Sequence, residues 1–167
     1  MPEIVNMEET LNQFSSAVVH GLPLRRCLTD KTVFVHPDNP DGKVRFTFCK
    51  LENDKPSGIV AFCQTDHYHG IPCFNVGYAT DKNFRQKGIA TSLLKAAIID
   101  LSEGLKRQGI EDFYIEVGVE KSNIASQKVA SSVLKAIPVD SIDPDSGTPT
   151  FGYMCKASTL NFSERYV

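Results

Sequence analysis

Residues 83–94, NFRQKGIATSLL, bring cations and a glycine to the place where an apolar helical stripe begins. The first N–H groups of a helix lack partners within the helix, and together with the helix dipole they attract anions. Gly88 leaves the backbone uncovered there, and Arg85 and Lys87 add two positive charges beside it. A phosphate group can then approach the amides directly. The segment therefore predicts an anion-binding site at a helix N-terminus.

Two common phosphate-binding motifs are absent from the sequence. Neither the G-x-x-x-x-G-K-[ST] pattern of the P-loop nor the G-x-G-x-x-G pattern of dinucleotide-binding folds occurs in the 167 residues. The simplest alternative is a solvated, positively charged helix start whose glycine only permits a turn. From this short segment alone, both interpretations stay open.

The residues after this segment have the pattern of a long amphipathic helix. Apolar residues recur at helical spacing from Ile89 to Leu105, with polar residues between them. The basic pair at 106–107 complements the negative end of the helix dipole, and Gly109 follows as a C-terminal stop. We therefore expect a rigid helix whose first turn carries the anion site.

The other predicted elements alternate between helices and strands. Helical spacing predicts helices from Glu8 to Val19 and over 123–136, the second stopped by Pro138. Residues 20–30 indicate an irregular turn or a short helix. Strand patterns cover 32–36, 43–51, 59–64, 72–80 and 112–119, and a hairpin of 138–143 and 150–156 closes the series. This order predicts an α+β fold with one parallel crossover in a mostly antiparallel sheet.

Length and composition favour a single soluble globular domain. The 167 residues fit one hydrophobic core, and 41% of them are hydrophobic. The formal net charge of −2 gives no field that draws the chain to nucleic acid or to an anionic membrane. No apolar run approaches the roughly 18 residues that cross a bilayer, and residues 1–10 do not resemble a secretory signal. We expect neither nucleic acid nor a membrane as a partner.

The cysteines and histidines do not form a ligand pattern. Five cysteines are scattered without a C-x-x-C pair, and their number is odd. We interpret them as small buried residues in a reducing cytoplasm, rather than as a disulfide framework or a zinc site. His67 and His69 flank Tyr68 in a predicted turn, where no third ligand accompanies them. No metal site is expected.

Residues 77–98, GYATDKNFRQKGIATSLLKAAI, resemble the acetyl-CoA-binding segment of the GNAT N-acetyltransferase superfamily. The resemblance rests on the preceding strand, on Phe84, on the pattern R-x-x-G-x-A from Arg85 and on the long helix. Residues 119–134, VEKSNIASQKVASSVL, resemble the second motif of the family, and the serine after its asparagine is similar to the ribosomal-protein N-terminal acetyltransferase-like branch. The resemblance implies one acetyltransferase domain over 1–167, with a mixed sheet of about six to seven strands and helices on both faces.

The same resemblance implies where acetyl-CoA binds as a co-substrate. Its pyrophosphate would lie on the backbone amides of the helix start, and its pantetheine arm would run as a mock strand beside the preceding strand. In the family that strand splays from the next one, so that backbone N–H groups at 76–78 face the thioester oxygen. The implied contacts are Tyr78, Ala79, Thr80, Arg85, Gln86, Lys87, Gly88, Ile89, Ala90, Thr91 and Asn123. The asparagine is equally suited to cap its own helix.

Two positions depart from the usual acid–base pair of the family. Gly118 stands where many relatives have a glutamate, and Ala130 stands where they have a tyrosine. Glu116 points the same way along the strand as Gly118, so we take it as the candidate water-mediated general base. The alternative for this carboxylate is an outward-facing residue paired with a cation. Ser126 is the candidate acid that the serine-bearing branch implies.

The acceptor implied by the resemblance is a primary amine, either a protein N-terminus or a small molecule such as a polyamine. At pH 7 about 10–15% of an α-amine is neutral, whereas deprotonating a lysine-type amine costs about 4–5 kcal/mol, so the second needs a strong base more. Asp143 and Asp145, in the last turn, either meet a cationic acceptor or stay solvated. Homodimers are common in the family, so a homodimer is also implied as possible.

A second interpretation belongs to a different functional class. With Gly118 and Ala130 in place of an acid–base pair, the chain would be a non-catalytic acyl-CoA-binding or sensing domain. A toxin that acetylates aminoacyl-tRNA is disfavoured, because a net charge of −2 attracts phosphates weakly.

Overall fold

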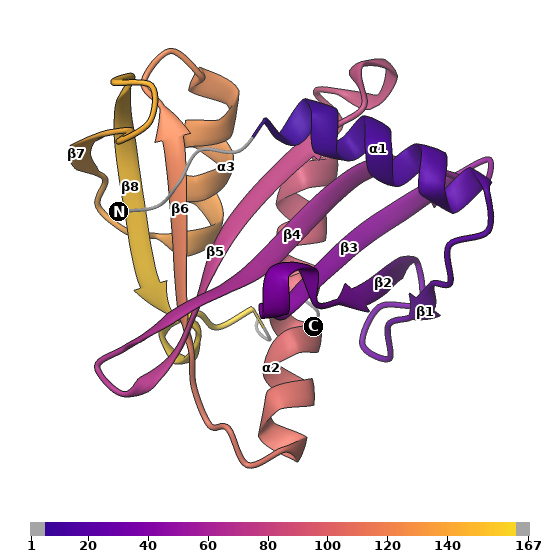
Figure 1. The fold of residues 1–167 in the computed structure, drawn as a ribbon, viewed down its shortest axis with the longest axis horizontal. Helices are drawn as coiled ribbons and strands as arrows, with labels where there is room; N and C mark the ends of the chain where they lie inside the picture. Colours follow the sequence, from indigo (N-terminus) through magenta and orange to yellow (C-terminus); the bar gives the residue numbers. More distant parts are fainter. Residues whose placement is uncertain (1–5, 163–167) are drawn as a thin grey trace.

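The structure is a computed structural model that describes residues 6–162. One eight-stranded sheet, in the order β1-β2-β3-β4-β5-β6-β8-β7, forms its centre (Figure 1). The strands are β1 Arg25–Arg26, β2 Val33–Asp38, β3 Arg45–Glu52, β4 Lys55–Tyr68, β5 Ile71–Thr80, β6 Tyr114–Glu120, β7 Val139–Ile142 and β8 Pro149–Lys156. The helices are α1 Met7–Val19, α2 Ile89–Arg107 and α3 Ile124–Leu134, with short 3-10 turns at Pro40–Gly42, Lys82–Phe84 and Ala157–Thr159.

The sheet confirms the α+β fold and its single parallel crossover. Strands β5 and β6 pair in parallel across α2, and the other neighbouring strands are antiparallel. The strand count is eight rather than six to seven. Part of the difference is β1, which lies within residues 20–30, where we expected an irregular turn or a short helix. It pairs with β2. Strand β4 also runs on to Tyr68, so the following turn is confined to the tip of the hairpin.

Helices cover both faces of the sheet, as predicted. Figure 1 shows α1 across β3, β4 and β5 on one face, with α2 behind them. The alternation along β4 separates the two layers, because Ile59 packs with Leu11 of α1, whereas Val60 and Phe62 belong to the larger core that includes α2 and α3. Strand β3 is therefore buried on both sides along Thr47–Cys49, where the sequence predicted one solvated face.

The cysteines match their predicted role only in part. All five lie in the described part of the chain, and none forms a disulfide. Cys27, Cys49 and Cys73 are buried, whereas Cys155 is half-buried and Cys63 is exposed. Burial raises the pKa of the Cys49 thiol to about 12, so this thiol is an inert core group. Within residues 6–162, no helix combines the length and the apolar composition that crossing a membrane requires.

Candidate functional site

The parallel strands β5 and β6 are paired only at one end. Their register joins Cys73 to Tyr114, Phe74 to Ile115 and Asn75 to Glu116. Beyond these pairs β5 continues to Thr80 and β6 continues to Glu120 without further pairing to each other. Because alternate backbone groups of a strand point toward each of its neighbours, part of the N–H and C=O groups of β5 faces this gap. The gap is the splay that the family resemblance implies.

A cavity of about 1210 Å³ extends from this gap. Its walls are the unpaired ends of β5 and β6, the first turns of α1, α2 and α3, and the loop between β7 and β8. Figure 1 shows where these elements lie in the fold. The implied coenzyme contacts that line this cavity are Tyr78, Ala79, Thr80, Arg85, Gln86, Gly88, Ile89, Ala90, Thr91 and Asn123. Residues from distant parts of the chain thus meet around one space.

The start of α2 has no side-chain cap. Gly88 is the N-cap residue, with a left-handed φ of 74°, and the first turn contains no acidic residue. A Cβ at this position would meet nothing within 4 Å, so the backbone angle rather than crowding favours glycine. Helix N–H groups without an internal partner line the cavity here, which suits a phosphate or diphosphate.

The two cations of this segment have different surroundings. The Arg85 Nε donates to the Thr80 carbonyl at 3.3 Å, and its guanidinium lies 3.6 Å from the Glu8 carboxylate at the start of α1. Lys87 does not line the cavity, and its Nζ lies 5.4 Å from the centre of the Phe84 ring. Arg85 is therefore the cation that borders the cavity beside the glycine.

The start of α3 is tied to β5 across the cavity. Asn123 caps the helix, because its Oδ1 accepts a hydrogen bond from the Ser126 N–H at 3.1 Å. The Tyr78 hydroxyl donates to the Ser126 carbonyl at 2.6 Å. Burial raises the pKa of Tyr78 well above its usual value, so the phenol stays neutral and remains a donor. This contact fixes the separation between β5 and α3.

The candidate base lies at the closed end of the gap. Glu116 is half-buried on β6, and it does not line the cavity. Burial raises the pKa of its carboxyl above the ordinary value. Ser126, the candidate acid, does line the cavity, whereas Ala130 is fully buried in the core. Ser126 thus lines the same cavity as the implied coenzyme contacts, whereas Glu116 lies outside the cavity lining.

Some residues that line the cavity were not assigned to the site from the sequence. Asn6, Met7 and Glu8 of the α1 start line it, as does Glu120. No local signal locates the α1 residues there, since a helical pattern gives no information about which strand the helix crosses. The spacing from Gly118 offers a signal for Glu120, because side chains two apart on a strand share a face.

Asp143 has a role other than a solvated turn residue. It is only 7% exposed, and it lines the cavity, whereas Asp145 does not. Its carboxylate accepts from the Ser146 hydroxyl at 2.7 Å and from the Asp145 N–H at 3.3 Å. Asp143 therefore holds the β7–β8 loop in shape at the cavity edge.

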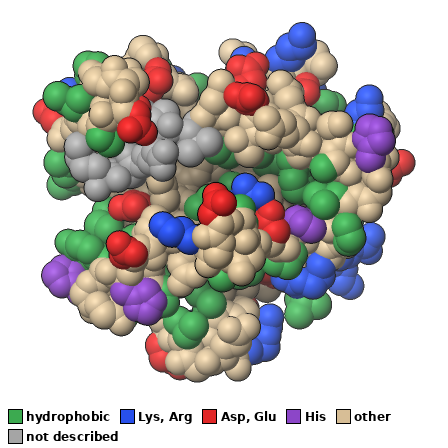
Figure 2. Space-filling view, in the orientation of Figure 1, with side chains coloured by type: hydrophobic (Ala, Val, Ile, Leu, Met, Phe, Trp, Pro, Cys, Tyr) green, Lys and Arg blue, Asp and Glu red, His purple; other side chains and the backbone are tan. Residues whose placement is uncertain are grey.

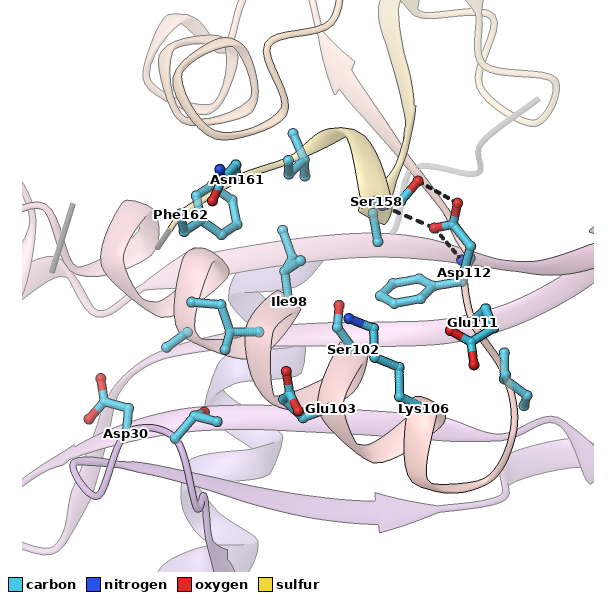
Figure 3. A pocket seen from close by; sticks show the side chains of 17 residues that line it. Asp30, Ile98, Ser102, Glu103, Lys106, Glu111, Asp112, Ser158, Asn161 and Phe162 are labelled. Atoms are coloured by element: carbon cyan, nitrogen blue, oxygen red, sulfur yellow. Dashed lines mark hydrogen bonds between the residues drawn. The ribbon is translucent and has the colours of Figure 1, made fainter. Parts of the chain in front are cut away.

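A second cavity, of about 620 Å³, lies along α2 away from its N-terminus (Figure 3). At one end the Ser158 N–H and hydroxyl donate to Asp112, at 3.0 and 2.5 Å. Asp30, Glu103 and Glu111 also line this cavity, and these acidic residues outnumber Lys106, so the lining opposes an anionic ligand. The larger cavity is therefore the better candidate for a phosphate ligand. On the face that Figure 2 shows, basic and acidic side chains are interspersed.

Comparisons with known proteins agree with this architecture. A sequence model described as the acetyltransferase (GNAT) family matches residues 18–133. No curated protein matches the sequence. A GNAT-family acetyltransferase from Streptococcus pneumoniae superposes with a TM-score of 0.50 at 16% identity, over 67% of this chain and 66% of that chain, which is just under two thirds of its length.

Two further matches are acetyltransferases whose descriptions name a ribosomal protein. One, from Salmonella typhimurium, is described as modifying the N-terminal serine of L7/L12, and it matches at 14% identity and a TM-score of 0.47 over 66% of this chain and 63% of that chain. Another is a ribosomal L7/L12 alpha-N-protein acetyltransferase in complex with coenzyme A, at 17% identity and a TM-score of 0.49 over 66% and 61%. At these identities the likeness concerns the fold.

Proposed function

Because the chain belongs to the GNAT acetyltransferase family, whose model matches residues 18–133, we propose that it transfers an acetyl group from acetyl-CoA to a primary amine. The observation that carries the proposal is the gap between β5 and β6, which opens beside the uncapped start of α2. The amine attacks directly, so no acyl-enzyme forms.

The residues around the gap fit acetyl-CoA, the co-substrate of this family. The amides of the α2 first turn and the Arg85 guanidinium suit the pyrophosphate, and the open edge of β5 at Tyr78–Thr80 suits the amide groups of the pantetheine arm. Asn123 already caps α3 through Oδ1, so the contact that it adds to the arm comes from its Nδ2 group.

In the proposed reaction the chain positions the reactants, stabilises the developing charge with its backbone dipoles and transfers protons. When bound, acetyl-CoA supplies an acetyl thioester whose C–S bond breaks as the amine forms a C–N bond and the sulfur leaves as a thiol. Backbone N–H groups at 76–78 stabilise the charge that develops on the carbonyl oxygen. Glu116 accepts the amine proton through a water molecule, and Ser126 donates to the leaving sulfur.

The acidic residues at the cavity edge favour a cationic amine as the acceptor. Glu120 and Asp143 line the cavity and attract a protonated amine before its proton is lost, whereas the Glu8 carboxylate lies 3.6 Å from the Arg85 guanidinium. A protein N-terminus and a small amine both satisfy this requirement. The N-terminal amine needs less help from a base, since its pKa is near 7.8 rather than about 10.4.

The test begins with binding and continues with turnover. We expect isothermal titration calorimetry to detect acetyl-CoA, and a ligand at about 100 times its Kd to stabilise the fold by about 2.7 kcal/mol. A panel of peptide N-termini, polyamines and lysine-type amines then identifies the acceptor by release of free thiol. The absence of binding at millimolar acetyl-CoA would overturn the proposal.

A non-catalytic acyl-CoA sensor is the second candidate. It is favoured by the position of Glu116 outside the cavity lining and by the replacement of the family's acid–base pair by Gly118 and Ala130. The same experiments separate the two candidates. Tight acetyl-CoA binding without thiol release for any amine in the panel supports the sensor.

A further inference from the structure

Met7, the first residue of α1, lies directly on the backbone of β5 at Gly77. A Cβ built on Gly77 would come within 2.5 Å of the Met7 sulfur and 2.9 Å of its Cγ, both far inside contact distance. Both residues line the large cavity. The thioether therefore closes the cavity wall over the strand, and glycine is what permits this approach.

The position of Met7 is fixed by the helix that carries it. Asn6 caps α1 by accepting from the Glu9 N–H at 3.1 Å. One turn further along, Leu11 is 3% exposed and packs with Cys49 and Ile59. The helix is thus anchored on the sheet, so that Met7 is held in place over Gly77.

Gly77 lies where the reactive end of the proposed co-substrate falls. The start of α2 adjoins Thr80, and the gap closes at Asn75, so a ligand whose diphosphate is at α2 reaches toward the closed end along β5. Gly77 is three residues from Thr80, about 10 Å at the rise of a strand. It also lies between Val76 and Tyr78, which would present their backbone to the thioester.

Building on the proposed function, we propose that Met7 sets the acyl-chain length by occupying the space over Gly77 that additional carbons would need. An acetyl group fits beside the thioether, whereas each added methylene has to displace it. Methionine is flexible, but moving it costs its contacts with the α1 layer. A single methylene changes selectivity in such apolar pockets by about 10-fold or more.

The experiment compares the affinities of CoA, acetyl-CoA, butyryl-CoA and hexanoyl-CoA by calorimetry. For the native chain we expect acetyl-CoA to bind at least about tenfold more tightly than hexanoyl-CoA. Met7→Ala should reduce this ratio to about twofold or less, whereas Met7→Leu, which keeps most of the volume, should preserve it. CoA, which has no acyl group, reports whether the rest of the site is intact.

Two further variants separate the acyl site from a general loosening of α1. Leu11→Ala removes the anchor without opening the cavity, since Leu11 does not line it, and should lower stability while preserving the acyl ratio. Gly77→Ala should displace Met7 and weaken acetyl-CoA binding, and adding Met7→Ala should restore that binding. Circular dichroism melts establish that each variant is folded.

The possible outcomes distinguish this inference from the proposed function. If the native chain binds hexanoyl-CoA as well as acetyl-CoA, or if Met7→Ala keeps the native ratio, Met7 does not set chain length. An equal change in Leu11→Ala overturns the inference too. If CoA and every thioester fail to bind the native chain, the proposed function itself is wrong.

Discussion

Asn75 on β5 and Glu116 on β6 form the last pair of the parallel ladder, and beyond this pair the two strands separate. Glu116 is therefore placed at the closed end of the gap, close to the proposed position of the thioester. Burial raises the pKa of its carboxyl, which makes the carboxylate a stronger base than an exposed glutamate. The first two predictions rest on this position of Glu116 and on the raised pKa of its carboxyl.

Glu116→Gln should lower kcat by about 100-fold or more while leaving the Kd of acetyl-CoA unchanged, because it removes the base and keeps the shape. In the proposed reaction, protonation of the acceptor amine lowers kcat/KM in both proteins, and protonation of Glu116 adds a second fall in the native chain, with an apparent pKa above about 4.3, the ordinary value for glutamate. Glu120→Gln, on the same strand and in the cavity lining, is the matched control. A larger loss in Glu120→Gln would transfer the role of base to that residue.

Glu116→Gln should also change how stability depends on pH. A carboxyl with a raised pKa contributes stability that is fully present below the pKa of the unfolded state, about 4.3, and is lost as pH rises through the folded pKa. The variant lacks this loss, so its Tm should exceed that of the native chain at pH 7 and approach it near pH 4. Thermal melts over this range check the prediction, and parallel curves for the two proteins would contradict it.

Gly88→Ala should weaken both the fold and coenzyme binding. A left-handed φ costs a residue with a Cβ about 1–2 kcal/mol, and the added methyl group stands where a phosphate approaches the amides. Gly104→Ala, in the interior of the same helix, is the control and should stabilise by about 0.5–1 kcal/mol. Urea unfolding and CoA calorimetry measure the two effects. Equal changes of stability and of CoA affinity in the two variants would show that the start of α2 has no particular role in the fold or in CoA binding.

Arg85 and Glu8 should act in opposite directions on CoA affinity. The Glu8 carboxylate lies 3.6 Å from the guanidinium and competes with a phosphate for it, so Glu8→Gln should tighten CoA binding by up to about fivefold, as for an exposed ion pair. Arg85→Ala should weaken it, and more than Lys87→Ala, because Lys87 lies outside the cavity lining. Calorimetry at low and high salt should show the Arg85 effect shrink as salt rises.

Local patterns predicted much of the fold and the uncapped helix start that lines the candidate site. The R-x-x-G-x-A spacing and the periodicity after it located the start of α2, because both depend on backbone preferences within one short segment. Asn123 also appeared as a helix cap, which its side chain is suited to be. The long helix then required β5 and β6 to be parallel neighbours.

The remaining features depend on tertiary packing. The sequence pattern predicted α1 but not that Met7 meets Gly77, a contact between residues far apart in the chain. It left Asp143 either solvated or facing a cationic acceptor, and the folded loop buries its carboxylate, which accepts a hydrogen bond from Ser146. It assigned Lys87 to the coenzyme together with Arg85, and the fold places only Arg85 of this pair in the cavity lining.

Strand β8 lies between β6 and β7, although it follows both in the chain. Strand β6 pairs with β5 over three residues only, whereas β8 supports it from Tyr114 to Glu120. One wall of the gap is thus held in place by β8, the last strand among the described residues. A nascent chain that still lacks Pro149–Lys156 has no completed cavity, so CoA binding during synthesis would report that this strand has been inserted.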